Sequence, residues 1–146
     1  MQRILLAVDG SEYTDKVVEK GLVLAEGVNA EVTVVTVVGE YVFSPRVSLQ
    51  FSDDNWDRIN KHLKEEAEEI VEKAAKPFKD KGLTVKTKAV ISHQAPADAI
   101  CELAREGDFD LIVIGSRGLR GVKELFLGSV SNKVAHMGCT SVLIVK

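Results

Sequence analysis

The stretch DLIVIG, residues 110–115, decides the fold class that the sequence predicts. Its four central residues are all apolar, and a glycine ends the run. An uninterrupted apolar run is typical of a strand that is covered on both faces, as strands of parallel sheets are. Working outward from it, we find four more short runs rich in β-branched residues, at residues 3–8, 31–38, 84–91 and 141–146.

Helical patterns separate these runs. Apolar residues recur at helical spacing over residues 14–26, 53–81, 97–106 and 129–137. We expect Gly27 and Gly138 to end the first and last of these helices. In the second we expect Asp53 or Asp54 as the N-cap and a kink or an end at Pro77. The alternation predicts a single α/β domain over residues 1–146, a doubly wound five-stranded parallel sheet with helices on both faces.

Composition narrows the class of protein. The 146 residues carry a net charge of −3 with 28% charged residues, so we expect no nucleic-acid partner. No run approaches the roughly 20 apolar residues of a membrane span, and the five apolar residues near the start are too few for a signal peptide. Cys101 and Cys139 have no CxxC spacing, which predicts reduced thiols and a cytoplasmic protein, with Cys101 buried and inert.

Two further features bear on function. Residues 39–52 form a long irregular segment, whose Tyr41, Phe43 and Phe51 are expected to pack rather than to cover a ligand. The three histidines are scattered without metal-ligand spacing, so we predict no metal site in the protein itself.

Polar and glycine residues follow two of the predicted strands. Asp9 is the first polar residue after residues 3–8, and GSRGLRGVKELFLGS, residues 115–129, begins at the end of the run at 110–115. Gly115 and Gly118 permit a tight loop whose amides bind an anion, and Gly128 and Ser129 open a helix whose unpaired N–H groups favour one. The hydroxyls of Ser129 and Ser131 add donors.

The residues alone leave two interpretations open. In the first, the two amide-rich ends hold a chain of phosphates while Asp9 accepts hydrogen bonds from ribose hydroxyls. In the second, the glycines are ordinary turn residues, Gly128 is a helix stop and Asp9 caps the first helix, because glycine-rich loops are weak signals by themselves.

The spacing of this stretch resembles a family pattern. GSRG, nine further residues and GS match Gly-x2-Gly-x9-Gly-(Ser/Thr), the ATP-binding pattern of one branch of the universal stress protein family. RILLAVDGSEYTDKVVEKGLVLA is similar to the family's opening strand, aspartate and first helix. APADAICELAREGDFDLIVIGSRG and LGSVSNKVAHMGCTSVLIVK resemble its second half, so the similarity covers essentially the whole chain.

The resemblance implies a sheet order of 3-2-1-4-5, with the first and fourth strands as neighbours. It also implies an ATP site, or one for AMP or ADP, with Mg²⁺ held mainly by the phosphates. Ala7 and Asp9 would lie beside adenosine, and the backbone of Val37 would meet adenine. The ribose and phosphates would contact Gly115, Ser116, Arg117, Gly118, Gly128, Ser129, Val130 and Ser131.

Three functions are compatible with such a site. The one we expect is a nucleotide-dependent regulatory switch in stress response, with a protein partner that the sequence does not identify. The alternatives are a slow ATPase or phosphotransferase, with Glu124 as a candidate base, and a partner-binding domain without nucleotide. Arg117, Arg120 and Lys123 are candidates to neutralise phosphate charge. In the implied order residues 141–146 form an apolar edge strand, which predicts a homodimer through that strand.

Overall fold

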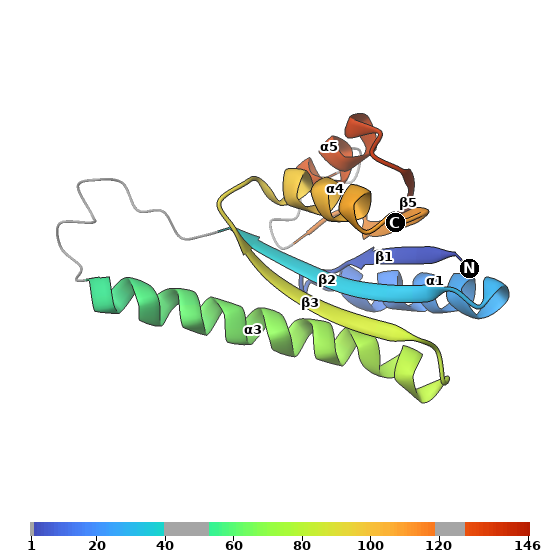
Figure 1. The fold of residues 1–146 in the computed structure, drawn as a ribbon, viewed down its shortest axis with the longest axis horizontal. Coiled ribbons are helices and arrows are strands. Elements are labelled where there is room, and N and C mark those ends of the chain that lie inside the picture. The colour runs from blue at the N-terminus through green and yellow to red at the C-terminus, as the bar shows by residue number, and fades with distance from the viewer. Residues whose placement is uncertain (1, 40–52, 119–127) are drawn as a thin grey trace.

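The computed structural model describes residues 2–39, 53–118 and 128–146, with the backbone alone at residues 53 and 54. Within these residues strands and helices alternate along the chain (Figure 1). They are β1 (Arg3–Ala7), α1 (Tyr13–Val28), β2 (Glu31–Gly39), α3 (Asp53–Asp80), β3 (Val85–Ser92), α4 (Pro96–Glu106), β4 (Leu111–Gly115), α5 (Ser129–Met137) and β5 (Ser141–Val145).

The strands form one parallel sheet in the order β3-β2-β1-β4-β5, which confirms the predicted fold class and strand order. The strands differ in length at their carboxyl ends. β1 ends at Ala7, opposite Val35 of β2 and Ile114 of β4. β2 continues to Gly39, and its last residues pair with β3 alone. The end of β2 therefore projects past β1 at the edge where parallel sheets carry their ligands.

The uninterrupted apolar runs are explained by two cores, one on each face of the sheet. On one face α1 and α3 cover residues that include Ile4, Leu6, Val34 and Val113. On the other face α4 and α5 cover residues that include Leu5, Val35, Ile112 and Ile114. Figure 1 shows these helix pairs on opposite sides of the strands. None of the described helices is long and apolar enough to span a membrane.

Helix α1 lies close to β1 because of Gly21. A Cβ atom at this position would come within 2.5 Å of Cδ1 of Leu6. We expected the helix to end at Gly27, but it runs to Val28. The next residue, Asn29, adopts the left-handed conformation (φ 50°) and donates its N–H to the Ala25 carbonyl. Asparagine tolerates that conformation better than other side chains, so it ends the helix in place of glycine. Gly138 ends α5 in the left-handed conformation, as predicted.

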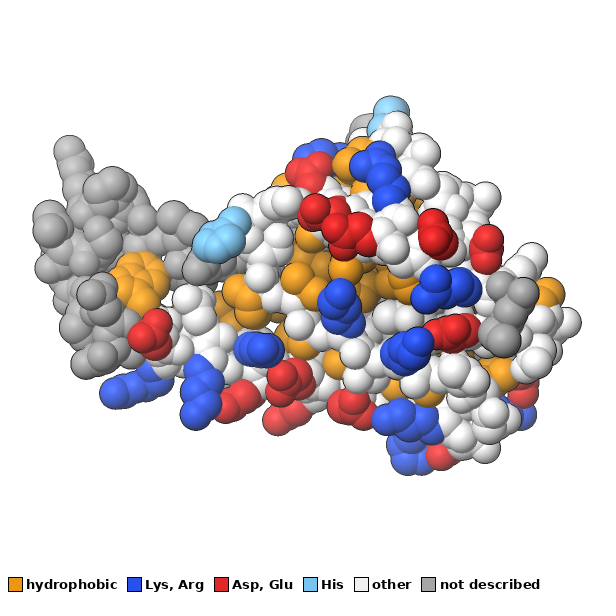
Figure 2. Space-filling view, in the orientation of Figure 1, with side chains coloured by type: hydrophobic (Ala, Val, Ile, Leu, Met, Phe, Trp, Pro, Cys, Tyr) orange, Lys and Arg blue, Asp and Glu red, His pale blue; other side chains and the backbone are white. Residues whose placement is uncertain are grey.

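Helix α3 is longer than the sheet it covers, and its first turns project beyond the strands (Figure 1). The helix continues through Pro77 to Asp80, so Pro77 does not end it. The predicted capping role of Asp53 or Asp54 concerns side chains outside the described residues. Acidic and basic side chains alternate along the exposed face of this helix, as the interleaved charges in the sequence predict (Figure 2).

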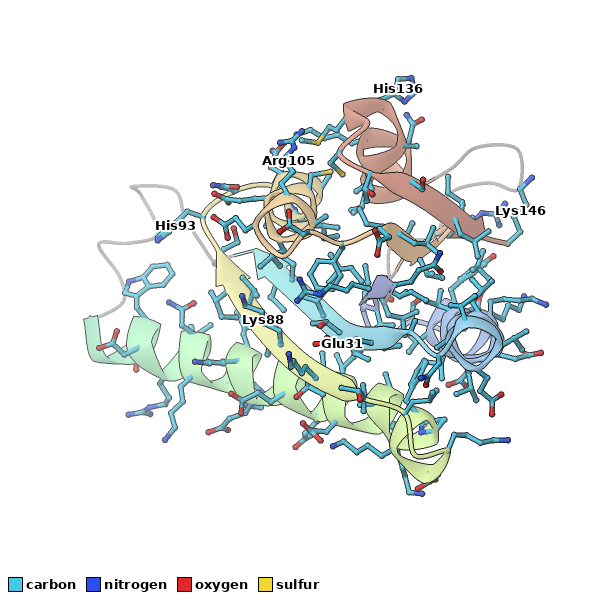
Figure 3. The ribbon with its side chains drawn as sticks, turned by 45° about the vertical axis from the view of Figure 1, so that its right-hand side comes forward. Glu31, Lys88, His93, Arg105, His136 and Lys146 are labelled. Atoms are coloured by element: carbon cyan, nitrogen blue, oxygen red, sulfur yellow. The ribbon has the colours of Figure 1, made fainter. Side chains whose placement is uncertain are left out.

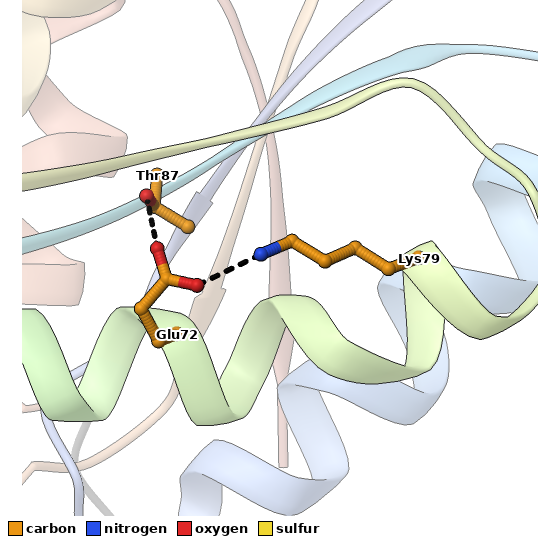
Figure 4. Close-up of polar contacts among 3 residues, drawn as sticks. All are labelled: Glu72, Lys79 and Thr87. Carbon is orange, nitrogen blue, oxygen red and sulfur yellow. Dashed lines mark hydrogen bonds and ion pairs between the residues drawn. The ribbon is translucent and has the colours of Figure 1, made fainter.

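One carboxylate on α3 connects the helix to the edge strand β3. Glu72 accepts hydrogen bonds from Thr87 Oγ1 at 2.7 Å and from Lys79 Nζ at 2.8 Å (Figure 4). The hydrogen bond from Lys79, with that from Thr87, holds the pKa of the Glu72 carboxyl below its ordinary value of 4.5. The ionised carboxylate is therefore the form that the folded state favours.

Candidate functional site

A cavity of about 870 Å³ lies at the carboxyl ends of the strands, where the projecting end of β2, the end of β1 and the end of β4 meet. Its volume is within the range of small-molecule sites. All but one of the predicted site residues line it, namely Ala7, Asp9, Val37, Gly115, Arg117, Gly118, Gly128, Ser129, Val130 and Ser131. The exception is Ser116, which is buried next to the cavity wall.

Asp9 lies two residues after the end of β1 and shapes the turn into α1. Its Oδ1 accepts the backbone N–H of Ser11 at 2.9 Å, and the N–H of Gly10 reaches Thr14 Oγ1 at 3.0 Å. Gly10 has a φ of +78°, which favours glycine. Asp9 thus stabilises the turn before α1 and is not its N-cap, which is Glu12. Oδ2 of Asp9 faces Gly118, where a Cβ atom would approach it to 2.5 Å.

The peptide unit of Ser116 ties β4 to β5 and to the start of α5. Its N–H donates to the Val145 carbonyl at 2.7 Å, and its carbonyl accepts the N–H of Gly128 at 2.5 Å. Ser131 Oγ also lies against carbonyl oxygens, 3.2 Å from that of Ser116 and 3.1 Å from that of Gly128. The Ser116 peptide and the Ser131 hydroxyl proton are therefore used by the fold, contrary to the expectation that the Ser131 hydroxyl is a free donor.

The start of α5 offers backbone donors to the cavity. Its N-cap is Gly128, which has no side chain to accept the N–H groups of the first turn. Those groups belong to Ser129, Val130 and Ser131, all of which line the cavity. Gly128 thus opens α5, as the phosphate interpretation requires, and the residues that precede it, 119–127, lie outside the described residues. A Cβ atom there would lie 3.1 Å from the Ser116 carbonyl oxygen.

Arg117 contributes positive charge at the same end of the cavity. It lines the cavity, and its Nε is buried without a hydrogen-bond partner among the described atoms. The positive end of the α5 dipole adds to this charge. Arg120, Lys123 and Glu124, the other charged candidates, lie outside the described residues, as do residues 40–52. Among the described residues no group of three or more His, Cys, Asp and Glu side chains is placed to hold a metal ion.

Val37 presents its backbone to the cavity, for a reason that follows from the sheet. The Val35 carbonyl accepts the N–H of Val8, so the polar backbone groups of Val35 point toward β1. Successive residues of a parallel strand direct these groups to alternate sides, so those of Val37 also point toward β1. Because β1 has ended there, the amide and carbonyl of Val37 face the cavity, and Val37 lines it.

Several lining residues were missed by the sequence analysis. Tyr13 and Thr14 begin α1, and Leu63, Glu66 and Ile70 make a wall from the middle of α3. Leu63 and Ile70 belong to the periodic apolar positions of that helix, and periodicity alone does not separate core positions from cavity-lining ones. The projection of α3 beyond the sheet, which only the structure shows, decides which of these apolar positions line the cavity.

Comparisons with known proteins agree on one family. The sequence profile of the universal stress protein family matches residues 1–146. Universal stress protein YxiE of Bacillus subtilis is 34% identical over 147 residues, covering 99% of this chain and 98% of its own. The solved structure of MJ0577 from Methanocaldococcus jannaschii has a TM-score of 0.83 at 27% identity, covering 99% of this chain and 95% of that one. A universal stress protein solved in complex with cAMP has a TM-score of 0.66 at 28% identity, with coverages of 99% and 95%.

Proposed function

The chain belongs to the universal stress protein family, and from that membership we propose that it binds an adenine nucleotide and acts as a regulatory switch in stress response. ATP with Mg²⁺ is the ligand that we favour, and AMP and ADP are the alternatives. The observation that carries the proposal is the cavity itself. A base-sized apolar end and a cationic, amide-rich end share one space of about 870 Å³. The relative that was solved with cAMP supports a nucleotide as the ligand class.

The apolar end suits adenine. Ala7, Val37 and Ile100 line the cavity there, and the backbone amide and carbonyl of Val37 offer a donor and an acceptor side by side. An adenine ring presents a complementary pair at its N1 and its exocyclic amine. Guanine presents a carbonyl in place of that amine, so the same backbone pair disfavours it.

The polar end suits a ribose and phosphates. The carboxylate of Asp9 accepts hydrogen bonds from sugar hydroxyls, while the N–H groups of residues 129–131 and the guanidinium of Arg117 donate to phosphate oxygens. Gly118 and Gly128 fit this arrangement, because a Cβ atom at Gly118 would intrude on Asp9 and one at Gly128 would crowd the backbone of Ser116 and Arg117. Magnesium, when present, would be held chiefly by the phosphates and water.

We favour retention of the nucleotide over rapid turnover. Two described carboxylates line the cavity: Asp9, which is already bonded to the Ser11 amide, and Glu66 on α3, whose Oε1 lies 3.1 Å from His62 Nε2. A base that activates water needs to reach the terminal phosphate, and a carboxylate that holds the ribose is badly placed for that. The consequence is a protein whose bound nucleotide reports a cellular state to a partner, with slow hydrolysis at most.

The test is to identify the small molecule that co-purifies with the protein and to follow its fate. We expect denaturation of the purified protein to release an adenine nucleotide, which mass spectrometry identifies. Calorimetry with Mg·ATP should show binding, and Arg117→Ala should weaken ATP by about tenfold or more while adenosine is unaffected. No heat and no thermal shift with millimolar Mg·ATP would refute nucleotide binding, and multiple turnovers within minutes would refute the switch.

We also propose that β5 mediates a homodimer. β5 is an edge strand of the sheet, and Leu143 on it is 37% exposed. An apolar, exposed edge strand invites pairing with a second chain, and pairing with its own copy creates a two-fold dimer. Size-exclusion chromatography with light scattering tests this, and a monomer at micromolar concentration contradicts it.

A further inference from the structure

The two cysteines, distant in sequence, are neighbours in the structure. Cys101 lies on α4, and Cys139 follows Gly138 in the short connection between α5 and β5. Cys101 belongs to the core between the sheet and the α4–α5 layer, Cys139 packs against that core, and the two thiols are close enough for Cys139 to affect the pKa of Cys101 through a side-chain hydrogen bond. Figure 3 shows sulfur atoms between α4 and α5, near Arg105.

The two thiols differ in how oxidants reach them. Cys101 is completely buried, whereas Cys139 is half-buried. Burial, together with the hydrogen bond to Cys139, raises the pKa of the Cys101 thiol to about 12, and the nearby Arg105 lowers it by less. The prediction that Cys101 is a buried thiol is confirmed, and Cys139 is the thiol that meets solvent first.

We propose that Cys101 and Cys139 are a redox-active pair that forms a reversible intramolecular disulfide when the protein meets a hydroperoxide. The Cys139 sulfur attacks the terminal oxygen of the hydroperoxide and the O–O bond breaks. The other oxygen leaves with the Cys139 proton as an alcohol, or as water from hydrogen peroxide, and Cys139 becomes a sulfenic acid. The adjacent Cys101 sulfur then attacks the sulfenic sulfur, the S–S bond forms, and water leaves with the Cys101 proton. In sum the two thiols lose two electrons, and one hydroperoxide is reduced to one alcohol and one water, or one hydrogen peroxide to two waters. A dithiol reductant reverses the step by exchange.

The surroundings keep the pair together. Gly138 turns the chain in the left-handed conformation immediately before Cys139. Immediately after it, Thr140 Oγ1 lies 2.9 Å from the Phe109 carbonyl oxygen and 3.1 Å from that of Asp110. Thr140 thus anchors the chain directly after Cys139 to the part that joins α4 to β4. Formation of the S–S bond requires a local approach of two sulfur atoms and no rearrangement of the sheet.

The disulfide would connect α4 to the C-terminal end of α5. Both helices contribute to the cavity wall, α4 through Pro96 and Ile100 and α5 through its first turn. The pair is nevertheless separate from the cavity, since neither cysteine lines it. The proposal therefore stands or fails independently of nucleotide binding.

The experiment treats the full-length protein with hydrogen peroxide, alkylates the remaining thiols and maps the tryptic peptides. Cys101 and Cys139 fall in different tryptic peptides, residues 89–105 and 134–146. We expect a crosslinked pair of these peptides, loss of both alkylation sites, and recovery of both after dithiothreitol. Before oxidation, iodoacetamide should modify Cys139 at least about tenfold faster than Cys101.

Variants separate this outcome from other oxidations. Met137→Leu is the matched control, since it removes a neighbouring oxidisable sulfur and should leave the crosslink intact. Cys101→Ala should abolish the crosslink and send Cys139 to higher oxidation states. A wild-type protein that keeps both thiols after peroxide, or that carries oxygen on Cys139 without joining peptides 89–105 and 134–146, overturns the proposal. This wild-type result decides even if the variants do not fold.

Discussion

Replacing Gly118 by alanine tests how the end of β4 and the end of β1 cooperate. The new Cβ atom would lie 2.5 Å from Asp9 Oδ2, where ordinary van der Waals contact begins at 3.4 Å, so the carboxylate must move by about 1 Å. Gly118 does not have a φ in the left-handed region, which means that alanine strains no backbone angle. The perturbation therefore acts on the position of one carboxylate.

The expected loss can be estimated from what that carboxylate is proposed to bind. Hydrogen bonds to a charged group contribute about 1.5–3 kcal/mol, which corresponds to a rise in Kd of roughly 10- to 100-fold for Mg·ATP. The free energy of unfolding should change by less than about 1 kcal/mol, because the site is at the cavity rim. Calorimetric titration gives the first quantity and urea denaturation gives the second.

A matched control and a double-mutant cycle sharpen the test. Gly39 also lines the cavity, but a Cβ atom there has no heavy atom of the described residues within 4 Å, so Gly39→Ala should bind nucleotide within about twofold of the native protein. Gly118→Ala should add little to the effect of Asp9→Ala, because both act through the same carboxylate. Native affinity in Gly118→Ala, or full additivity with Asp9→Ala, refutes this reasoning.

Three further predictions concern stability and assembly. Gly21→Ala should destabilise the protein by about 1–3 kcal/mol, because the new Cβ atom would lie 2.5 Å from Cδ1 of Leu6. Gly27→Ala is on the same helix and meets no described atom within 4 Å, so it should stabilise the protein by up to about 1 kcal/mol. Urea denaturation measures both changes. Leu143→Glu on the edge strand should convert the proposed dimer to a monomer in light scattering, while the similarly apolar and exposed Val28→Glu on α1 should not. The folded state lowers the pKa of Glu72 below 4.5, so above that pH the native protein should resist urea better than Glu72→Gln. This difference in stability should vanish as the pH falls through the lowered pKa. A difference that persists in acid contradicts the assigned contacts.

The sequence predicts this fold well because its signals are local and agree with one another. The run at residues 110–115 and the four other runs all form strands, and each helical pattern forms a helix within about two residues of the expected bounds. The errors lie at helix ends, where competing signals are weak. Helix α1 ends at Val28 with Asn29 as its C-cap and not at Gly27, and α3 continues past Pro77. At the end of α1 one local preference replaces another, because Asn29 takes the left-handed conformation. At Pro77 the buried Phe78 that follows it packs in the core, and this packing outweighs the local preference.

The candidate site was predicted less completely, and for a definite reason. A glycine pattern locates the backbone but does not say which donors the fold itself consumes. Ser116 and Ser131 illustrate this, since both stand in the predicted site and both direct hydrogen bonds into the structure. The role of Val37 depends on the extension of β2 beyond the end of β1. The cavity wall that α3 provides depends on how far that helix projects beyond the sheet. These are properties of the assembled sheet, which no single segment encodes.

The hydrogen bond between Gly128 and Ser116 has an evolutionary consequence. It joins the residue that follows β4 to the N-cap of α5, so the described residues on either side of positions 119–127 are held together by the framework. Mutations inside that segment can change its chemistry or its length without moving the floor of the cavity. A different sequence or length between these two anchor points is therefore compatible with an inherited, unchanged scaffold.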